Sequence, residues 1–200
     1  PEQNDSYLTC RISPEALEQF LCSAAEKPTA VYLTSPDYLG TLADIAGLSV
    51  VCRRHGVLLL VDNAHGAYLR FVAEDKHPIS LGADLCCDSA HKTLPVLTGG
   101  AYLHFSAKCP VEYIDAAQKM LRVFATTSPS YLVLQSLDWC NGYLADDYRE
   151  NLARTVKRVL AVKEKIASFG YVVEETEPLK IVVNIKAAGY LGEAFTSHKQ

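Results

Sequence analysis

The feature that most constrains the fold is a series of short strand-like runs that are apolar on both faces. Residues 57–62 read VLLLVD and residues 83–90 read ADLCCDSA, so neither shows the polar and apolar alternation of a strand with one face in water. A third run, TAVYLT at 29–34, ends in the turn sequence SPD. Helical patterns separate these runs. Strands of this kind that alternate with helices predict an α/β fold, with a mostly parallel sheet covered on both faces.

The helices of the first half carry start and stop signals. Residues 13–23 begin with Ser13 as a candidate N-cap and Pro14 at the first helical position, followed by leucines at helical spacing. From 41 to about 55, apolar residues again recur at helical spacing, and Gly56 is a natural C′ stop. We also expect a short helical segment near 78–82 and a strand at 100–105.

The second half of the chain has a different pattern. After residue 106 it is mostly helical, with helices expected at 110–124, 131–144 and 146–168. The runs YVVEE and LKIVVNI that follow read as strands of the alternating kind. We therefore predict three parts: most of an α/β domain at 1–145, a long connecting helix at 146–170, and the start of a smaller α+β domain at 171–200.

Composition excludes several classes of function. A net charge of −4 without any basic run argues against nucleic acid and anionic membranes as partners. The longest purely apolar stretch is far below the ~18 residues of a membrane span. Seven cysteines without a CxxC pair predict free thiols and no metal site, and so a reducing compartment such as the cytoplasm. The chain opens without Met or a signal-like segment, and both ends suggest a fragment of a larger protein.

Two chemically distinctive residues fall at one edge of the predicted sheet. Asp62 ends one strand and Lys92 follows the end of the next, so right-handed crossovers place both at the carboxyl edge, where ligands of such sheets bind. The chain has neither a dinucleotide fingerprint nor a P-loop, and it lacks a nucleophile elbow. An aspartate, a lysine and several hydroxyls suit pyridoxal phosphate (PLP), which needs an amine for its imine, a carboxylate for its pyridine nitrogen, and donors for its phosphate.

Further donors lie close in sequence to this pair. Ser89 and His91 flank the lysine. Thr127 and Ser128 precede the helix at 131–144, with Pro129 expected in its first turn, and a helix N-terminus attracts anions. Taken singly, such residues have more ordinary roles as caps, turn residues and solvated side chains. Their joint order and spacing favour the cofactor site.

The segments VDNAHGAYL, DSAHKTLPVLTGGAYLH and TTSPSYL together resemble the major domain of the ornithine/lysine/arginine decarboxylase family of fold type I PLP enzymes. The similarity extends along nearly the whole chain, includes VYLTSPDYLG, and is closest to the short bacterial arginine/lysine-type members. It implies the PLP-dependent transferase-like fold, with a mostly parallel sheet flanked by helices. It also implies decarboxylation of arginine, lysine or ornithine to the amine and CO₂, by a homodimer or higher homo-oligomer.

The resemblance assigns a role to each site residue. Lys92 would form the imine with PLP, Asp62 would pair with the pyridinium nitrogen, Ala64 would leave room for the ring, and His65 would lie beside it. Phosphate binding would fall to Ser89 and His91, with Thr127 and Ser128 reaching the phosphate of a neighbouring subunit. Lys92 or His65 would return the proton to the substrate. The family's phosphate loop and ring-stacking residue are not visible in residues 1–28.

Two alternatives remain at this point. A cysteine desulfurase or an aminotransferase-like lyase keeps the same lysine and aspartate. Desulfurases, however, usually follow the lysine with a Gly-Pro-rich turn, and they carry a cysteine on a mobile loop, whereas the last cysteine here is Cys140 in a helical run. A non-catalytic remnant would retain only the fold and an interaction surface, and the intact Asp62 and Lys92 argue against it. The sequence leaves open which basic amino acid is the substrate.

Overall fold

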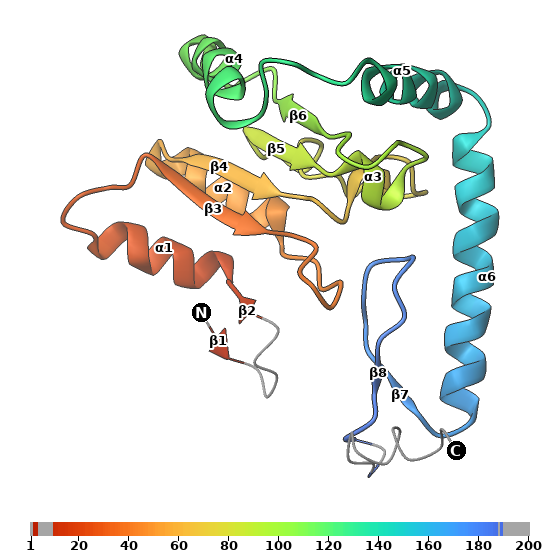
Figure 1. Cartoon of the computed structure of the whole chain (residues 1–200). Coiled ribbons are helices and arrows are strands. Elements are labelled where there is room, and N and C mark those ends of the chain that lie inside the picture. Colours follow the sequence, from red (N-terminus) through yellow and green to blue (C-terminus); the bar gives the residue numbers. More distant parts are fainter. Residues whose placement is uncertain (1, 4–9, 188, 190–200) are drawn as a thin grey trace.

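The computed structural model describes residues 2–3, 10–187 and 189 of the chain (Figure 1). Its centre is a four-stranded sheet in the order β3-β4-β5-β6, formed by Ala30–Thr34, Leu58–Asp62, Leu85–Asp88 and Tyr102–Phe105. The first three strands are parallel, as predicted, and β6 runs antiparallel to β5. This reversal follows from the connection, because the chain turns at the carboxyl edge where β5 ends and re-enters the sheet from that same edge.

Helices α1 (Pro14–Ser23) and α2 (Ile45–His55) begin and end at sequence-encoded caps. The Ser13 hydroxyl accepts a hydrogen bond from the Ala16 amide at 3.1 Å, and Gly56 closes α2 in the left-handed region at φ 68°. Helix α2 starts later than the predicted residue 41. Asp44 is its N-cap, and the Ser35 hydroxyl accepts from the Ala43 amide at 3.0 Å, which holds the preceding residues outside the helix.

Both helices cover one face of the sheet. Leu21 of α1 and Leu48 of α2 pack with Leu59 and Val61 of β4 in a buried apolar core. Within the described residues the opposite face is only half-buried or exposed, and Tyr32 there is 64 % exposed. The structure therefore differs from the expectation of a sheet covered on both faces.

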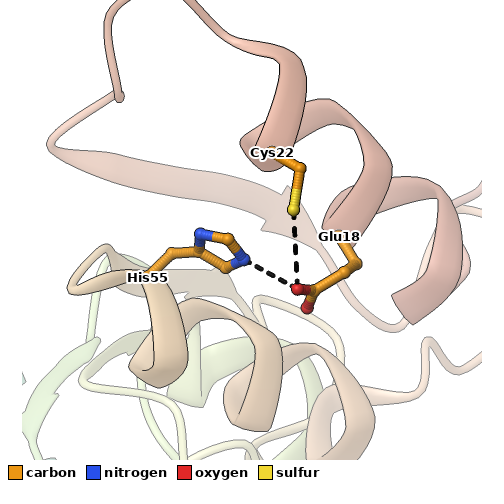
Figure 2. A group of neighbouring side chains, drawn as sticks. All are labelled: Glu18, Cys22 and His55. Atoms are coloured by element: carbon orange, nitrogen blue, oxygen red, sulfur yellow. Dashed lines mark hydrogen bonds and ion pairs between the residues drawn. The ribbon is translucent and has the colours of Figure 1, made fainter.

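A polar contact joins α1 to α2 outside this core (Figure 2). The Glu18 carboxylate lies 2.9 Å from both His55 Nε2 and Arg54 Nη1, and the Cys22 thiol lies 3.8 Å from it. The exposure of Arg54 and Glu18 makes this a weak surface ion pair that aligns the two helices rather than a major source of stability.

A second core lies at the carboxyl edge of the sheet. It brings together the 3₁₀ helix η1 (Ala67–Arg70), the short α3 (Ala90–Thr93), α5 (Tyr131–Ala145) and α6 (Tyr148–Ser168). Tyr68, Leu69 and Cys140 are its most buried large side chains. Figure 1 shows α6 running down one side of the molecule, with the hairpin of β7 (Val172–Val173) and β8 (Val183–Asn184) beside it. The remaining elements are α4 (Val111–Phe124) and the pair β1 (Glu2–Gln3) and β2 (Cys10–Arg11).

Local structure also departs from the prediction at residues 78–82 and in the length of the final strands. Residues 78–82 form hydrogen-bonded turns and not a helix, because Gly82, at φ 104°, ends the segment after a single turn. The final strands are much shorter than the runs YVVEE and LKIVVNI. No helix in the described ranges combines the length and the apolar character needed to cross a membrane.

Candidate active site

Asp62 is the last residue of β4, and its carboxylate is held by three donors at the carboxyl edge. Oδ1 accepts from the Ala64 amide at 3.0 Å and lies 3.9 Å from the Cys87 thiol, its register partner on β5. Oδ2 accepts from the Tyr32 hydroxyl at 3.3 Å. Burial and the negative charge of Asp62 raise the pKa of Tyr32, so this phenol stays a proton donor. The carboxylate is thereby fixed in orientation.

Lys92 lies on α3, directly beyond the end of the neighbouring strand. Its amide donates to the Ser89 carbonyl at 3.0 Å, which closes the turn that presents the side chain. The side chain is exposed, and Nζ lies 3.3 Å from His65 Nε2. His65 and Lys92, which are 27 positions apart in sequence, therefore lie together at the carboxyl edge of the sheet, as the parallel topology predicted.

His65 is neutral in this arrangement. Burial lowers its pKa, and the positive charges of Lys92 and Lys180 lower it further. A neutral ring with its lone pair on Nε2 accepts a hydrogen bond from the Lys92 ammonium. His65 is thus a proton acceptor in contact with the lysine amine.

Lys180 is a residue that the sequence analysis missed. Its Nζ donates to the Tyr38 carbonyl at 2.8 Å and lies 5.7 Å from the Tyr38 ring centroid. The segment that carries it is fixed by Glu177, which is 4 % exposed and accepts from the Tyr68 hydroxyl and from the Leu179 amide. No local motif marks these residues, because they reach the site from the far end of the chain.

The two predicted phosphate donors beside the lysine have different environments. Ser89 is half-buried, and its hydroxyl makes no capping bond to α3. His91 donates from Nδ1 to the Gly100 carbonyl at 3.0 Å, so its Nε2 can donate to a phosphate oxygen only when the ring is protonated. A Cβ at Gly100 would lie 2.2 Å from the Val96 side chain, so glycine is required where this loop closes.

Thr127 and Ser128 lie apart from this group. Both are exposed on the segment between α4 and α5, and no described hydrogen bond joins them to the Lys92 turn. The expectation that Pro129 lies in the first turn of the helix is wrong, because α5 begins at Tyr131 after an extended Ser130. Their role toward a neighbouring subunit stays a prediction.

The donor set fits pyridoxal phosphate. An exposed primary amine and an oriented carboxylate lie at the same sheet edge, with the half-buried Ala64 between the carboxylate and His65 in sequence. The Ser89 hydroxyl is available at the turn that presents the amine. These are the groups that an imine, a pyridinium nitrogen and a phosphate require.

Comparisons with known proteins agree with this chemistry. Residues 2–188 match the family described as Orn/Lys/Arg decarboxylase, major domain. The chain is 32 % identical to the uncharacterized protein YaaO of Bacillus subtilis over 166 residues, covering 77 % of this chain and 34 % of YaaO. It is 28 % identical to the arginine decarboxylase of the same organism over 198 residues, covering 88 % of this chain and 39 % of the relative.

Solved structures share the fold. A serine palmitoyltransferase from Sphingomonas wittichii superposes with a TM-score of 0.62 at 20 % identity, over 86 % of this chain and 43 % of that one. A cysteine desulfurase from Thermococcus onnurineus gives 0.66 at 14 % identity, over 94 % of this chain and 50 % of that one. The chain thus spans between a third and two fifths of the two curated relatives, and half or less of these structures. The family match covers nearly all of it, and the chain belongs to the Orn/Lys/Arg decarboxylase family, within its major domain.

Proposed function

We propose that the protein is a PLP-dependent decarboxylase that converts a basic amino acid, arginine, lysine or ornithine, into the corresponding amine and CO₂. The observation that carries the proposal is the 3.3 Å contact of Lys92 Nζ with His65 Nε2 at the same edge as the oriented Asp62. Family membership and the relatives named arginine decarboxylase support the reaction and the substrate class.

Each residue has a task that its environment supports. When bound, PLP supplies an aldehyde for imine formation and a pyridinium ring that accepts the electrons released as CO₂ leaves. Lys92 would provide the amine, and Asp62 would keep the proton on the ring nitrogen. His65, neutral and in contact with Lys92, can take up and return a proton at that position. Ser89 and, with its ring protonated, His91 would hold the phosphate, and Ala64 would leave space for the ring.

The assembly and location are part of the same proposal. Thr127 and Ser128 are exposed between α4 and α5, and these two helices carry a group of exposed apolar side chains: Val123, Phe124, Tyr131, Leu132 and Trp139. This arrangement is consistent with a second copy of the chain that binds there and completes the phosphate site. Six cysteines are free thiols, which suits the reducing cytoplasm: Cys22, Cys52, Cys86, Cys87, Cys109 and Cys140.

The deciding experiment measures CO₂ release from carboxyl-labelled arginine, lysine and ornithine by the full-length protein with PLP. We expect saturable release from one of the three, and none from the Lys92→Ala variant. Amino-group transfer to an added keto acid, or sulfide release from cysteine, would identify another fold type I activity and refute the proposal.

A further inference from the structure

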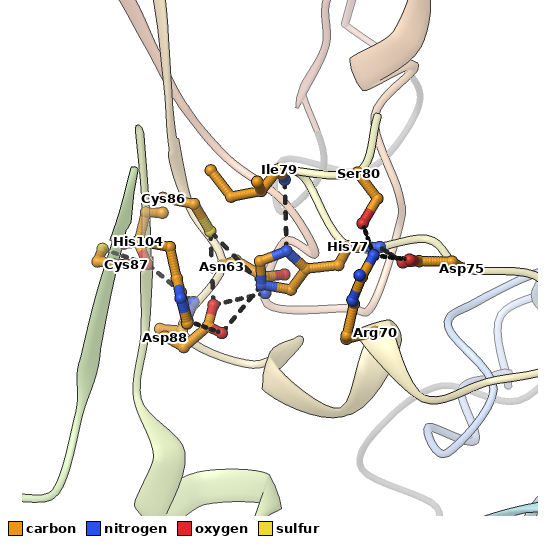
Figure 3. Close-up of polar contacts among 12 residues, drawn as sticks. Asn63, Arg70, Asp75, His77, Ile79, Ser80, Cys86, Cys87, Asp88 and His104 are labelled. Carbon is orange, nitrogen blue, oxygen red and sulfur yellow. Dashed lines mark hydrogen bonds and ion pairs between the residues drawn. The ribbon is translucent and has the colours of Figure 1, made fainter. Parts of the chain in front are cut away.

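A buried anion, Asp88, lies among polar side chains at the end of β5 (Figure 3). Asp88 is the last residue of β5 and is 3 % exposed. Its side chain and that of Cys86 point to the buried face, whereas Cys87 between them is exposed on the face that carries Asp62. None of the roles assigned to the PLP site uses Asp88.

Four side-chain donors surround the Asp88 carboxylate. His77 Nε2 and His104 Nε2 each lie 3.0 Å from Oδ2. Asn63 Nδ2 donates to Oδ1 at 2.7 Å, and the Cys86 thiol lies 3.5 Å from the same oxygen. The donors come from the loop after β4, the loop before β5, β5 itself and β6, so a single carboxylate joins four parts of the chain.

Asp88 is ionised within this cluster. Burial alone would raise its pKa, but the hydrogen bonds from His104 and His77 hold the pKa well below its usual value. A buried carboxylate with this many donors is stable in its charged form, whereas the loss of one partner leaves an unpaired buried charge or donor.

The histidine geometry indicates hydrogen bonds and not a metal. The three candidate ligand atoms of His77, Asp88 and His104 lie within 4.8 Å of one another, which is close enough for a cation. However, the Ile79 amide donates to His77 Nδ1 at 3.3 Å, so in the neutral ring the proton is on Nε2, facing Asp88. A metal at Nε2 would require that proton to move to Nδ1, where the amide already donates.

The cluster reaches both halves of the candidate site. Asn63 directly follows Asp62, and the backbone N–H of Asn63 donates to the Cys87 carbonyl at 2.9 Å. The Asn63 carbonyl accepts from the Gly66 amide at 2.8 Å, which closes the turn that carries His65. On the other side, Asp88 directly precedes Ser89, the N-cap of the turn that carries Lys92.

We propose that Asp88 is a positioning residue, which sets the placement of Lys92 relative to Asp62 and His65 through its bonds to Asn63, His77 and His104. The proposal rests on the function proposed above. Asp88 touches neither the cofactor nor the substrate. It acts by fixing the two loops that do, and misplacement of reacting groups by about 1 Å can slow a reaction about 10²-fold.

The test uses Asp88→Asn in the full-length protein. This variant keeps the size of the side chain and loses one charged acceptor. We expect the rate of imine formation with added PLP to fall by about tenfold or more. The rate is measured by visible absorbance and by borohydride trapping at Lys92. CO₂ release should fall through kcat, with KM little changed. The matched control is Val51→Ala in the α2 core, which loosens packing away from the site and should leave the rate of imine formation unchanged.

A second pair of variants keeps the proposal testable if Asp88→Asn does not fold. The His104 side chain is 38 % exposed, so substitution there is tolerated better. His104→Ala should slow imine formation several-fold, and His104→Gln, which retains a donor, should restore much of the rate. In the cofactor-free protein, ¹⁵N chemical shifts should show His77 protonated at Nε2.

The outcomes separate this proposal from the proposed function. If the wild-type protein forms the imine but releases no CO₂ from any of the three amino acids, the proposed function fails, and the imine rates still test Asp88. Wild-type imine rates in Asp88→Asn or in His104→Ala would overturn the positioning role. So would a stoichiometric metal ion that is retained by the wild-type protein and lost from both variants.

Discussion

At the scale of single residues, the candidate site depends on how charge is distributed between neighbours. Burial lowers the pKa of His65, and the positive charges of Lys92, 3.3 Å away, and of Lys180 lower it further, so the imidazole remains neutral where a proton acceptor is useful. Asp62 lies on the same edge with its carboxylate fixed by Ala64 and Tyr32. The site therefore combines an amine, a neutral base and a carboxylate that does not form an ion pair with the amine.

Lys92→Ala should abolish imine formation with PLP. In the described part of the chain Lys92 is the amine that the Asp62 edge presents beside His65. The measurement is visible absorbance after addition of PLP, followed by borohydride reduction and peptide mapping. A reducible adduct at another lysine of the site, formed at the wild-type rate, would show that the assignment of Lys92 is wrong.

Asp62→Asn should retain the cofactor and slow CO₂ release by about 10²-fold or more, because a preorganised charge opposite the pyridine nitrogen is lost. Asn retains the size of the side chain and an oxygen that can accept from the Ala64 amide. Cofactor content is measured by absorbance, and turnover by labelled CO₂. Near-normal turnover with full occupancy would exclude the electron-sink role of Asp62.

At the scale of elements, the sequence predicted the helix ends that depend on local caps and the residues that strand order brings to one edge. Ser13, Gly56 and the apolar run 57–62 specify their own elements, and parallel pairing then brings Asp62 and Lys92 to one edge. The Asp88 cluster and Lys180 could not be predicted in this way. The Asp88 cluster depends on the register of β5 with β6, which brings His104 to Asp88. Lys180 contacts Tyr38, which is more than a hundred residues earlier in the chain.

The Asp88 cluster predicts a specific pH dependence of stability. The pKa of Asp88 in the folded chain is held below its ordinary value of 3.8, so at low pH the unfolded chain binds a proton that the folded chain does not. The stabilisation is therefore complete well above pH 3.8 and is lost progressively as the pH falls from that value toward the lower pKa of the folded state. Urea unfolding at about pH 6 and at about pH 2.5 should show a larger loss of free energy of unfolding for the wild type than for Asp88→Asn. Equal losses would contradict an ionised, stabilising Asp88.

At the scale of the whole molecule, the sheet and its helices leave a large apolar surface on α4 and α5. Phe124 is 82 % exposed, Tyr131 86 % and Trp139 73 %. Soluble proteins rarely leave such groups of aromatic side chains uncovered. This surface supports the proposed homo-oligomer.

Substitution of this surface should separate the subunits. Phe124→Asp combined with Trp139→Glu should shift the full-length protein toward the monomer in sedimentation velocity, because charges would be buried at the interface. Phe20→Glu is the control, since Phe20 is an exposed aromatic residue on α1, away from α4 and α5. An unchanged sedimentation coefficient in the double variant would place the interface elsewhere.

The bond between Tyr68 and Glu177 has a consequence for the order in which the molecule is made. These residues are 109 positions apart, and contacts that close so long a loop form late. A ribosome releases Asp62, His65 and Lys92 well before it releases the segment that carries Glu177 and Lys180. The nascent chain thus presents the lysine before the charge that helps keep His65 neutral arrives. The contribution of Lys180 to the lowered pKa of His65, which comes after those of burial and of Lys92, therefore arises only once residue 180 has been synthesised.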